Sequence, residues 1–263
     1  MALRVDLNCD MGESFGAWTL GQDEALLDHV TSANIACGFH AGDPATMART
    51  VERAVAKGVT LGAHPSLPDL QGFGRRTMAV TPGEARNLML YQLGALDAFA
   101  RAAGSRLHHV KPHGALYNMA ARDRVLADAL AQAVKAFDPA LILVGLSGSA
   151  LIEAGRAAGL ACASEVFADR GYEADGSLTP RGLDGALIED EDLVIARVLR
   201  MVREGRVASR TGEDVTLQAD TLCLHGDQPR ALAFARRLRE ALGGAGIEVR
   251  SLASPGGARA IHL

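Results

Sequence analysis

The chain has 263 residues, of which 48% are hydrophobic and 22% charged, and this suits one large α/β domain, residues 1–263, with a substantial core. Its 27 basic and 31 acidic residues give a net charge of −4, which excludes the broad basic field that nucleic-acid binding needs. The acidic N-terminus lacks the apolar core of a signal peptide, and no apolar run is long enough to span a membrane. We therefore expect a cytoplasmic protein that contacts neither nucleic acid nor membrane.

Short apolar runs alternate with longer segments of helical periodicity, a pattern typical of βαβ units around a parallel sheet. The candidate strands are residues 3–9, 33–37, 59–63, 107–111, 141–146, 161–166, 221–225 and 247–252. Eight strands predict a closed or nearly closed (β/α) barrel, and a doubly wound sheet is the alternative. The four cysteines, Cys9, Cys37, Cys162 and Cys223, lie far apart in apolar stretches, which predicts reduced, buried thiols in a reducing compartment.

Capping residues mark the expected helix starts. Asp43 precedes a first-turn proline, Thr81 precedes a glutamate at capping-box spacing, and Asp190 opens a segment with one apolar face. Asp227 and Pro229 introduce a last helix through residue 242.

Two connections, residues 65–79 and 168–189, are longer than α/β packing needs, so we expect them to act as substrate loops or lids.

Polar side chains gather where the candidate strands end, which is the functional face of a barrel. On the first strand, Asp6, Asn8 and Asp10 alternate with apolar residues and so share one face. Polar groups that point into a barrel are costly to bury alone, which predicts a hydrated or liganded cavity. The alternative is an edge strand with an outward polar face.

Histidines follow four of the candidate strands, at positions 40, 64, 113 and 225. One carboxylate and two histidines from different strand ends can hold a divalent metal with open positions for water, and Asp10, His40 and His64 form that set. The same groups could instead act as metal-free acids and bases, with Lys111 stabilising an oxyanion.

No GxxxxGK(S/T) motif is present, and no GxGxxG follows a strand. The turn at residues 145–149 (GLSGS) could bind an anion at a helix N-terminus, although an ordinary βα turn explains it equally well. Arg75 and Arg76 could clamp a carboxylate or phosphate, or simply be solvated.

Six strings together resemble the LamB/YcsF family: DLNCDMGESFG, NIACGFHAGDP, GAHPSLPDLQGFGRR, VKPHGALYN, EVFADRGYEADGSLTPR and LCLHGD. They occur in family order over nearly the whole chain. The resemblance implies an irregular seven-stranded (β/α) barrel related to glycoside hydrolase/deacetylase-type barrels, so one of the eight candidate strands would lie outside it. It also implies ATP-dependent cleavage of 5-oxo-L-proline to L-glutamate, together with two further subunits, B and C.

That reaction assigns roles to the polar residues. The expected catalytic residues are Asp10 as base or metal ligand, Lys111 and His113 as stabilisers of charge on oxygen, and Glu13 as an orienting group. The expected substrate-binding residues are Asp6, Asn8, Arg75, Glu165 and Arg170, with an arginine on the substrate carboxylate. Because a phosphate loop is missing, we expect the ATP site to be shared with or supplied by the partner subunits.

Two other functions remain open at this point. One is a metal-dependent deacetylase or amidohydrolase that does not use ATP. The other is a non-catalytic subunit that binds the substrate and presents it to partners. A carbohydrate-binding barrel is disfavoured, because only 4% of the residues are aromatic.

Overall fold

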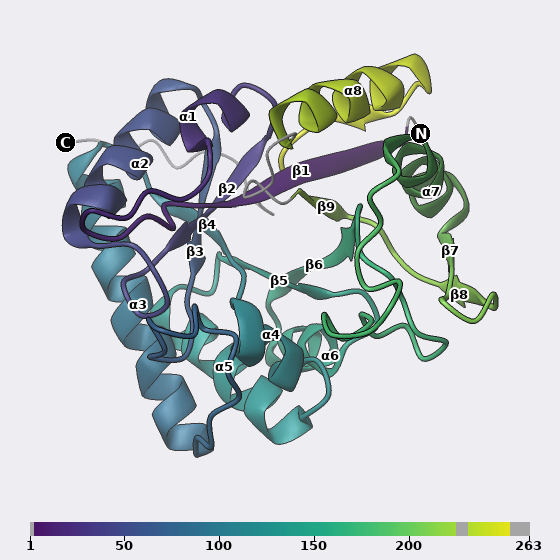
Figure 1. The fold of residues 1–263 in the computed structure, drawn as a ribbon. Helices are drawn as coiled ribbons and strands as arrows, with labels where there is room; N and C mark the ends of the chain where they lie inside the picture. Colours follow the sequence, from purple (N-terminus) through teal and green to yellow (C-terminus); the bar gives the residue numbers. More distant parts are fainter. Residues whose placement is uncertain (1–2, 225–230, 253–263) are drawn as a thin grey trace.

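Seven parallel strands close into a barrel in the computed structural model, which describes residues 3–224 and 231–252. The strands are β1 (Arg4–Met11), β2 (Ser32–Ala36), β3 (Thr60–His64), β4 (Leu107–Val110), β5 (Ile142–Leu146), β6 (Ala161–Phe167) and β9 (Thr221–Leu224). They pair in that order, and β9 pairs back onto β1 to complete the ring. The predicted seven-stranded barrel is confirmed (Figure 1).

The eighth predicted strand lies outside the ring. β10 (Glu248–Val249) pairs with β1 only at Arg4 and Val5, the end of β1 at which the chain enters the barrel. The barrel is already closed by the pairing of β9 with β1, so β10 is not part of its wall. The candidate strand 247–252 is therefore a two-residue strand at the amino-terminal end of β1.

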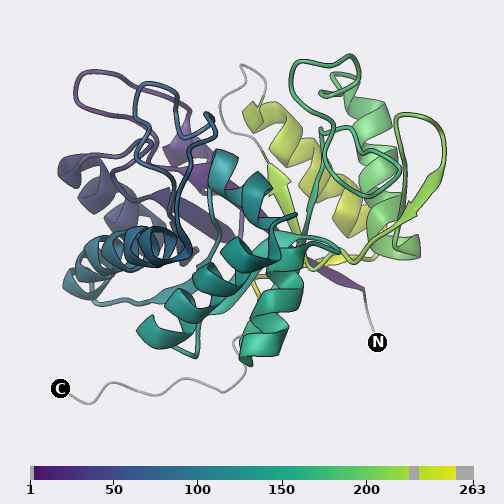
Figure 2. The ribbon, with the colours of Figure 1, turned by 90° about the horizontal axis from the view of Figure 1, so that it is seen from below.

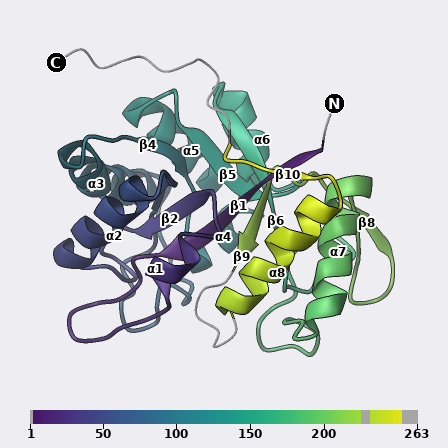
Figure 3. The same ribbon diagram turned by 90° about the horizontal axis from the view of Figure 1, so that it is seen from above.

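Helices surround the barrel (Figures 1 and 3). They are α1 (Asp23–Leu26), α2 (Pro44–Ala56), α3 (Pro82–Ala102), α4 (Gly114–Ala120), α5 (Arg124–Phe137), α6 (Ala150–Ala158), α7 (Glu191–Glu204) and α8 (Ala231–Gly244). The predicted caps are confirmed: Asp43 accepts from Thr46 N, Thr81 and Glu84 form a capping box, and Asp190 accepts from two amides of its helix. The predicted start of the last helix, at residues 227–229, lies outside the described residues.

Successive side chains of β1 point alternately outward, toward the helices, and inward, into the barrel. Val5, Leu7, Cys9 and Met11 are buried among the apolar side chains that join strands to helices. The three polar residues between them point the other way, into the barrel, as predicted. Cys162 departs from expectation, because it is only half-buried while the other three cysteines are buried; none forms a disulfide among the described residues.

A small antiparallel hairpin, β7 (Arg206–Ala208) and β8 (Asp214–Thr216), lies beside α7 and was not predicted (Figure 2). Each of its strands has three residues, too few to establish a period. The connection 168–189 has no helix and is held by isolated bridges, Arg170 to Leu187 and Tyr172 to Leu178. Within the described part of the chain, no helix is long and apolar enough to cross a membrane.

Candidate active site

The lowest inward side chain of β1, Asp6, is enclosed by hydroxyl groups. Thr31 and Ser32 donate to Asp6 Oδ1 at 2.6 and 2.7 Å, and Thr221 donates to Oδ2. Burial raises the pKa of this carboxyl, and the hydroxyl donors partly offset that rise. Asp6 is only 1% exposed and does not line the cavity described below, so the structure does not place it where a substrate could touch it.

One step higher, Asn8 joins four strands. Its amide group donates to Glu165 Oε1 at 3.0 Å and to Thr221 Oγ1 at 2.7 Å, and its carbonyl oxygen accepts from Asn34 at 2.7 Å. Asn34 in turn accepts from His109 Nε2 at 2.7 Å. Asn8 and Glu165 are therefore held by bonds inside the barrel, and neither lines the cavity, in contrast to their predicted contact with substrate.

The position of the His109 ring beside Asn34 requires glycine at position 62. A Cβ there would overlap the imidazole of His109, which lies across the β3–β4 pair. The close approach fixes the ring against Asn34, so Gly62 and His109 belong to the site's support although neither was singled out from the sequence.

Lys111 lies at the end of this hydrogen-bond network that is nearer the carboxyl ends of the strands. Its Nζ lies 2.8 Å from Glu165 Oε1, 3.0 Å from Asp10 Oδ1 and 3.2 Å from Cys223 Sγ, and the residue is 2% exposed. Burial opposes the charged form, but Asp10 and then its other neighbours outweigh this and raise the pKa of Lys111 well above its usual value. For Asp10, burial is likewise outweighed by His64 and Lys111, which hold its pKa well below the usual range. The two groups are an ion pair at neutral pH.

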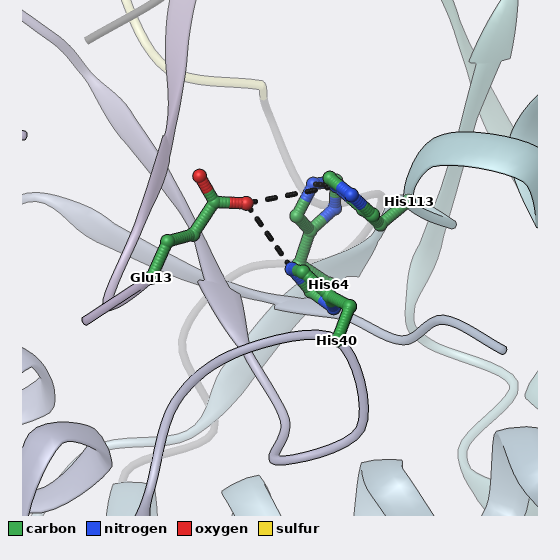
Figure 4. Close-up of side chains that lie close together, drawn as sticks. All are labelled: Glu13, His40, His64 and His113. Carbon is green, nitrogen blue, oxygen red and sulfur yellow. Dashed lines mark hydrogen bonds and ion pairs between the residues drawn. The ribbon is translucent and has the colours of Figure 1, made fainter. Parts of the chain in front are cut away.

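Above Asp10, four side chains converge: His64 from the last position of β3, and Glu13, His40 and His113 from the loops after β1, β2 and β4 (Figure 4). Their potential ligand atoms all lie within 4.8 Å of one another, so the group could hold a metal ion. The predicted metal set was Asp10, His40 and His64. The structure instead adds Glu13 and His113, while Asp10 lies beside the group with its Oδ2 3.2 Å from His64 Nε2.

Backbone carbonyls fix the orientation of two of these rings. His64 Nδ1 donates to Lys111 O at 2.7 Å, and His113 Nε2 donates to Phe73 O at 2.9 Å. Phe73 has a φ of 54°, a left-handed conformation that is unusual for a bulky residue and typical of functional sites. The remaining nitrogens, His64 Nε2 and His113 Nδ1, face each other at 3.0 Å. Two lone pairs this close need a proton or a cation between them.

The bonds from His64 to Lys111 O and from His113 to Phe73 O are of the kind that metal-binding histidines make, because the nitrogen that does not bind the metal usually donates to a carbonyl or carboxylate. Glu13 Oε1 lies 3.6 Å from His113 Nδ1 and 3.1 Å from His40 Nε2. His40 is stacked on His113 with ring centroids 3.8 Å apart and planes 7° apart. Since an ion in the plane of one stacked ring lies out of the plane of the other, joint coordination by both requires one ring to rotate.

Electrostatics also indicates that two of the three rings in the cluster, His40 and His113, are uncharged. Burial, and then the charge of Asp10, raise the pKa of Glu13 to about 8. Burial lowers the pKa of His40 and of His113 well below the usual value, so both rings are neutral near pH 7. A neutral imidazole is the form that binds a metal or accepts a proton.

A cavity of about 1040 Å³ opens above the cluster. Of the predicted site residues, it is lined by Asp10, Glu13, His64, Arg75, Lys111, His113 and Arg170. Both long connections contribute to its wall, through Arg75 and residues 174–181 respectively. His225, the fourth predicted histidine, lies outside the described residues.

The predicted arginines lie in different surroundings. Arg76 pairs with Asp69, whereas Arg75 lines the cavity with its guanidinium 4.9 Å from the centre of the Phe73 ring. Arg170 is buried and donates to two backbone carbonyls, from Nε to Ala186 O at 2.9 Å and from Nη2 to Thr179 O at 2.7 Å. These two bonds help to hold the 168–189 connection together.

Tyr117 on α4 is a lining residue that sequence reasoning missed. Its hydroxyl is buried beside the Glu165 carboxylate, and its ring packs edge-on against Phe167 with the ring centroids 6.0 Å apart. Burial and then the Glu165 carboxylate raise the pKa of this phenol well above its usual value. The string VKPHGALYN contains Tyr117, but only the fold shows that it reaches the cavity.

Several known proteins are similar to this chain over most of its length. The LamB/YcsF family model matches residues 5–256. The A subunit of 5-oxoprolinase from Methylococcus capsulatus is 64% identical over 252 residues, covering 96% of this chain and 97% of the relative. The Bacillus subtilis protein of the same name is 57% identical, covering 95% and 97%. The crystal structure of a lactam utilization protein from Thermus thermophilus has a TM-score of 0.90 and 52% identity, covering 95% of this chain and 100% of that one.

The contact between position 62 and His109 predicts a steric defect. Gly62→Ala should displace His109 from Asn34 and lower the free energy of unfolding by about 1–3 kcal/mol, the usual cost of overpacking. Urea unfolding measures this. Gly83→Ala is the matched control, because a Cβ there meets nothing within 4 Å; equal stability of the two variants would contradict the predicted clash.

The ion-paired Lys111 predicts strong coupling. Lys111→Met leaves Asp10 and Glu165 without their cation and should cost about 3–5 kcal/mol of unfolding free energy. In Lys111→Met/Glu165→Gln one stranded charge is removed, so the double variant should lose less than the sum of the single variants. Strict additivity in this double-mutant cycle would show that Lys111 and Glu165 do not interact as described.

Proposed function

The chain belongs to the LamB/YcsF family, and we propose that it is the lactam-binding subunit of a multi-subunit enzyme that hydrolyses 5-oxo-L-proline to L-glutamate with cleavage of ATP. The observation that carries the proposal is the array of acid, lysine and histidine groups on the floor of one cavity. The names of the relatives, which call them subunits of 5-oxoprolinase, support the same substrate and the existence of partner subunits.

A five-membered lactam is a stable amide, so its carbonyl carbon needs activation before water can add. In the proposed reaction the terminal phosphoryl group moves from ATP to the lactam oxygen, and ADP leaves. Water then adds to the carbon and loses a proton to a base, and the C–N bond breaks as the nitrogen gains a proton. Hydrolysis of the resulting acyl phosphate gives glutamate and phosphate.

Glu13 suits the transfer of these protons. A general acid or base works best with a pKa near the working pH, and the pKa of Glu13 is raised to about 8. Asp10, the base suggested by sequence, has a much lowered pKa and is held by Lys111 and His64. We therefore assign Asp10 to the positioning of His64 and Lys111.

Charge that develops on the lactam oxygen needs nearby donors. Lys111 lines the cavity together with Glu13 and supplies positive charge for this role. His113 also lines the cavity, but its Nε2 already donates to Phe73 O, so it can donate to the substrate only from Nδ1 once that atom has taken up a proton. Phe167 and Tyr117 offer an apolar wall for the ring of the substrate. We assign the substrate carboxylate to Arg75, which lines the cavity from the 65–79 connection beside Phe73, whereas Arg170 is buried and donates to two backbone carbonyls.

Reconstitution with partner subunits B and C tests the proposal. The complete mixture should consume 5-oxoproline and form ADP in step, whereas the isolated chain should do neither. Glu13→Gln should lower turnover by a factor of about 10² to 10⁴, the usual contribution of a positioned acid or base. Asp10→Asn should also lower turnover, because it removes the charge that pairs with Lys111 and positions His64.

Asp28→Asn is the matched control, since Asp28 pairs with Lys57 on the surface and should leave turnover unchanged. Unchanged turnover in both site variants, with 5-oxoproline still bound, would favour a subunit that only presents the substrate. ATP-dependent release of glutamate by the isolated chain would refute the need for partners.

A second candidate function is favoured by the ligand atoms gathered around His64 and His113. A divalent ion held by these two rings, with a carboxylate from Asp10 or Glu13, would polarise a carbonyl and lower the pKa of bound water. The chain would then be a metal-dependent amidohydrolase or deacetylase that needs no ATP.

Metal analysis separates the two candidates. If the second is right, the purified chain should hold about one equivalent of zinc or a similar ion, and amide hydrolysis should proceed without ATP. His64→Ala and His113→Ala should each lose the metal, while His29→Ala, outside the cluster, should retain it. A metal-free chain that turns over 5-oxoproline with its partners would exclude the second candidate.

A further inference from the structure

The cavity is much larger than a lactam requires. Its volume of about 1040 Å³ lies at the upper end of the range of about 300–1,000 Å³ that holds drug-sized ligands. A five-membered ring with one carboxylate fills a small part of that space. The cavity therefore has room for a second and larger ligand beside the substrate.

The unfilled part lies across the barrel from the histidine cluster. In the closed strand order, β5 is separated from β1 by β6 and β9 on one side and by β2 to β4 on the other. The turn after β5 therefore faces the loops that carry Glu13 and His40. We call this part of the cavity the outer arm, and it is lined by Arg122, Ser147, Gly148, Ser149, Ser177 and Arg181.

Positive charge dominates the outer arm. Arg122 and Arg181 are exposed. Hydrogen bonds from Ser177, and then the charge of Arg122, lower the pKa of Asp175, so Arg122 lies near that carboxyl. Arg181 also lies close enough to Arg170 to add to the lowering of its pKa, which burial causes first. Of the two acids that line this end, Asp214 is engaged by Arg200 at 2.6 Å, which leaves Asp175 as the one described acid facing these arginines.

The turn between β5 and α6 is open to an approaching anion. Gly148 lines the cavity with a φ of 76°, and a Cβ built there meets nothing within 4 Å. Its backbone is thus accessible from the cavity, and Ser147 and Ser149 on either side supply hydroxyl groups. Two arginines and an accessible glycine turn are the parts from which polyphosphate sites are commonly built.

We propose that the outer arm binds the polyphosphate chain of the nucleoside triphosphate, with Arg122 and Arg181 holding the phosphate oxygens. This inference rests on the proposed ATP-dependent function and gives this chain the phosphate half of a nucleotide site. The terminal phosphate then points across the barrel toward Lys111 and His113, where the lactam oxygen lies. The outer arm would also account for phosphate binding by a chain that lacks a GxxxxGK(S/T) motif.

Calorimetric titration of the full-length chain with inorganic tripolyphosphate tests the outer arm without the reaction. The wild-type chain should bind it, and Arg122→Ala and Arg181→Ala should each weaken binding by about tenfold, since each removes charge-assisted hydrogen bonds. Arg122→Lys should retain part of the affinity because the charge is kept. Arg86→Ala, an exposed arginine on α3 away from the cavity, should bind as the wild type does.

The same variants in the reconstituted complex separate this inference from the function on which it rests. Arg122→Ala and Arg181→Ala should raise the KM for ATP and leave the KM for 5-oxoproline unchanged. A wild-type chain that does not bind tripolyphosphate, or variants with unaltered affinity and KM for ATP in an active complex, would overturn the outer arm and leave the proposed function standing. A wild-type complex that couples no ATP cleavage to loss of 5-oxoproline would overturn both.

Discussion

The ammonium group of Lys111, buried between the carboxylates of Asp10 and Glu165, is the interaction on which the site depends. It joins β1, β6 and the end of β4 at one point inside the barrel. The main chain of the same residue accepts the hydrogen bond that orients His64, so a single position sets both the charge of the floor and the direction of the ring above it. A buried charge is tolerated only when it is paired, and here the pairing also keeps Asp10 ionised.

Local patterns in the sequence predicted local structure well. The alternation of polar and apolar residues in the first strand correctly turned Asp6, Asn8 and Asp10 inward, and the capping residues Asp43 and Thr81 mark real helix starts. A cap is decided by three or four neighbouring residues, and a strand face by a period of two. Neither depends on which other strand lies alongside.

What the sequence could not give is register across strands. It predicted a hydrated or liganded cavity beside Asp6, Asn8 and Asp10, and of these only Asp10 lines the cavity. Around Asp6 and Asn8 the hydroxyl and amide groups of Ser32, Asn34 and Thr221 fill the space. For the same reason it grouped Asp10 with His40 and His64 and left out Glu13 and His113 from the metal group. These residues meet only because the register between β1, β2, β3 and β4 brings the carboxyl ends of the four strands to the same level of the barrel. The spacing of residues along the chain does not specify that register.

The partners of Asp6 also bear on how the chain reaches its folded state. Thr221 lies 215 residues further along the chain than Asp6, yet its hydroxyl completes the shell around that carboxylate. Closure of the ring brings the first strand together with the last, so the barrel has many contacts between residues far apart in sequence, a property that slows folding. During synthesis the inward face of β1 is made early and its last donor emerges late. Until then water, rather than protein, solvates that carboxylate, and the interior becomes dry only in the final stage of assembly.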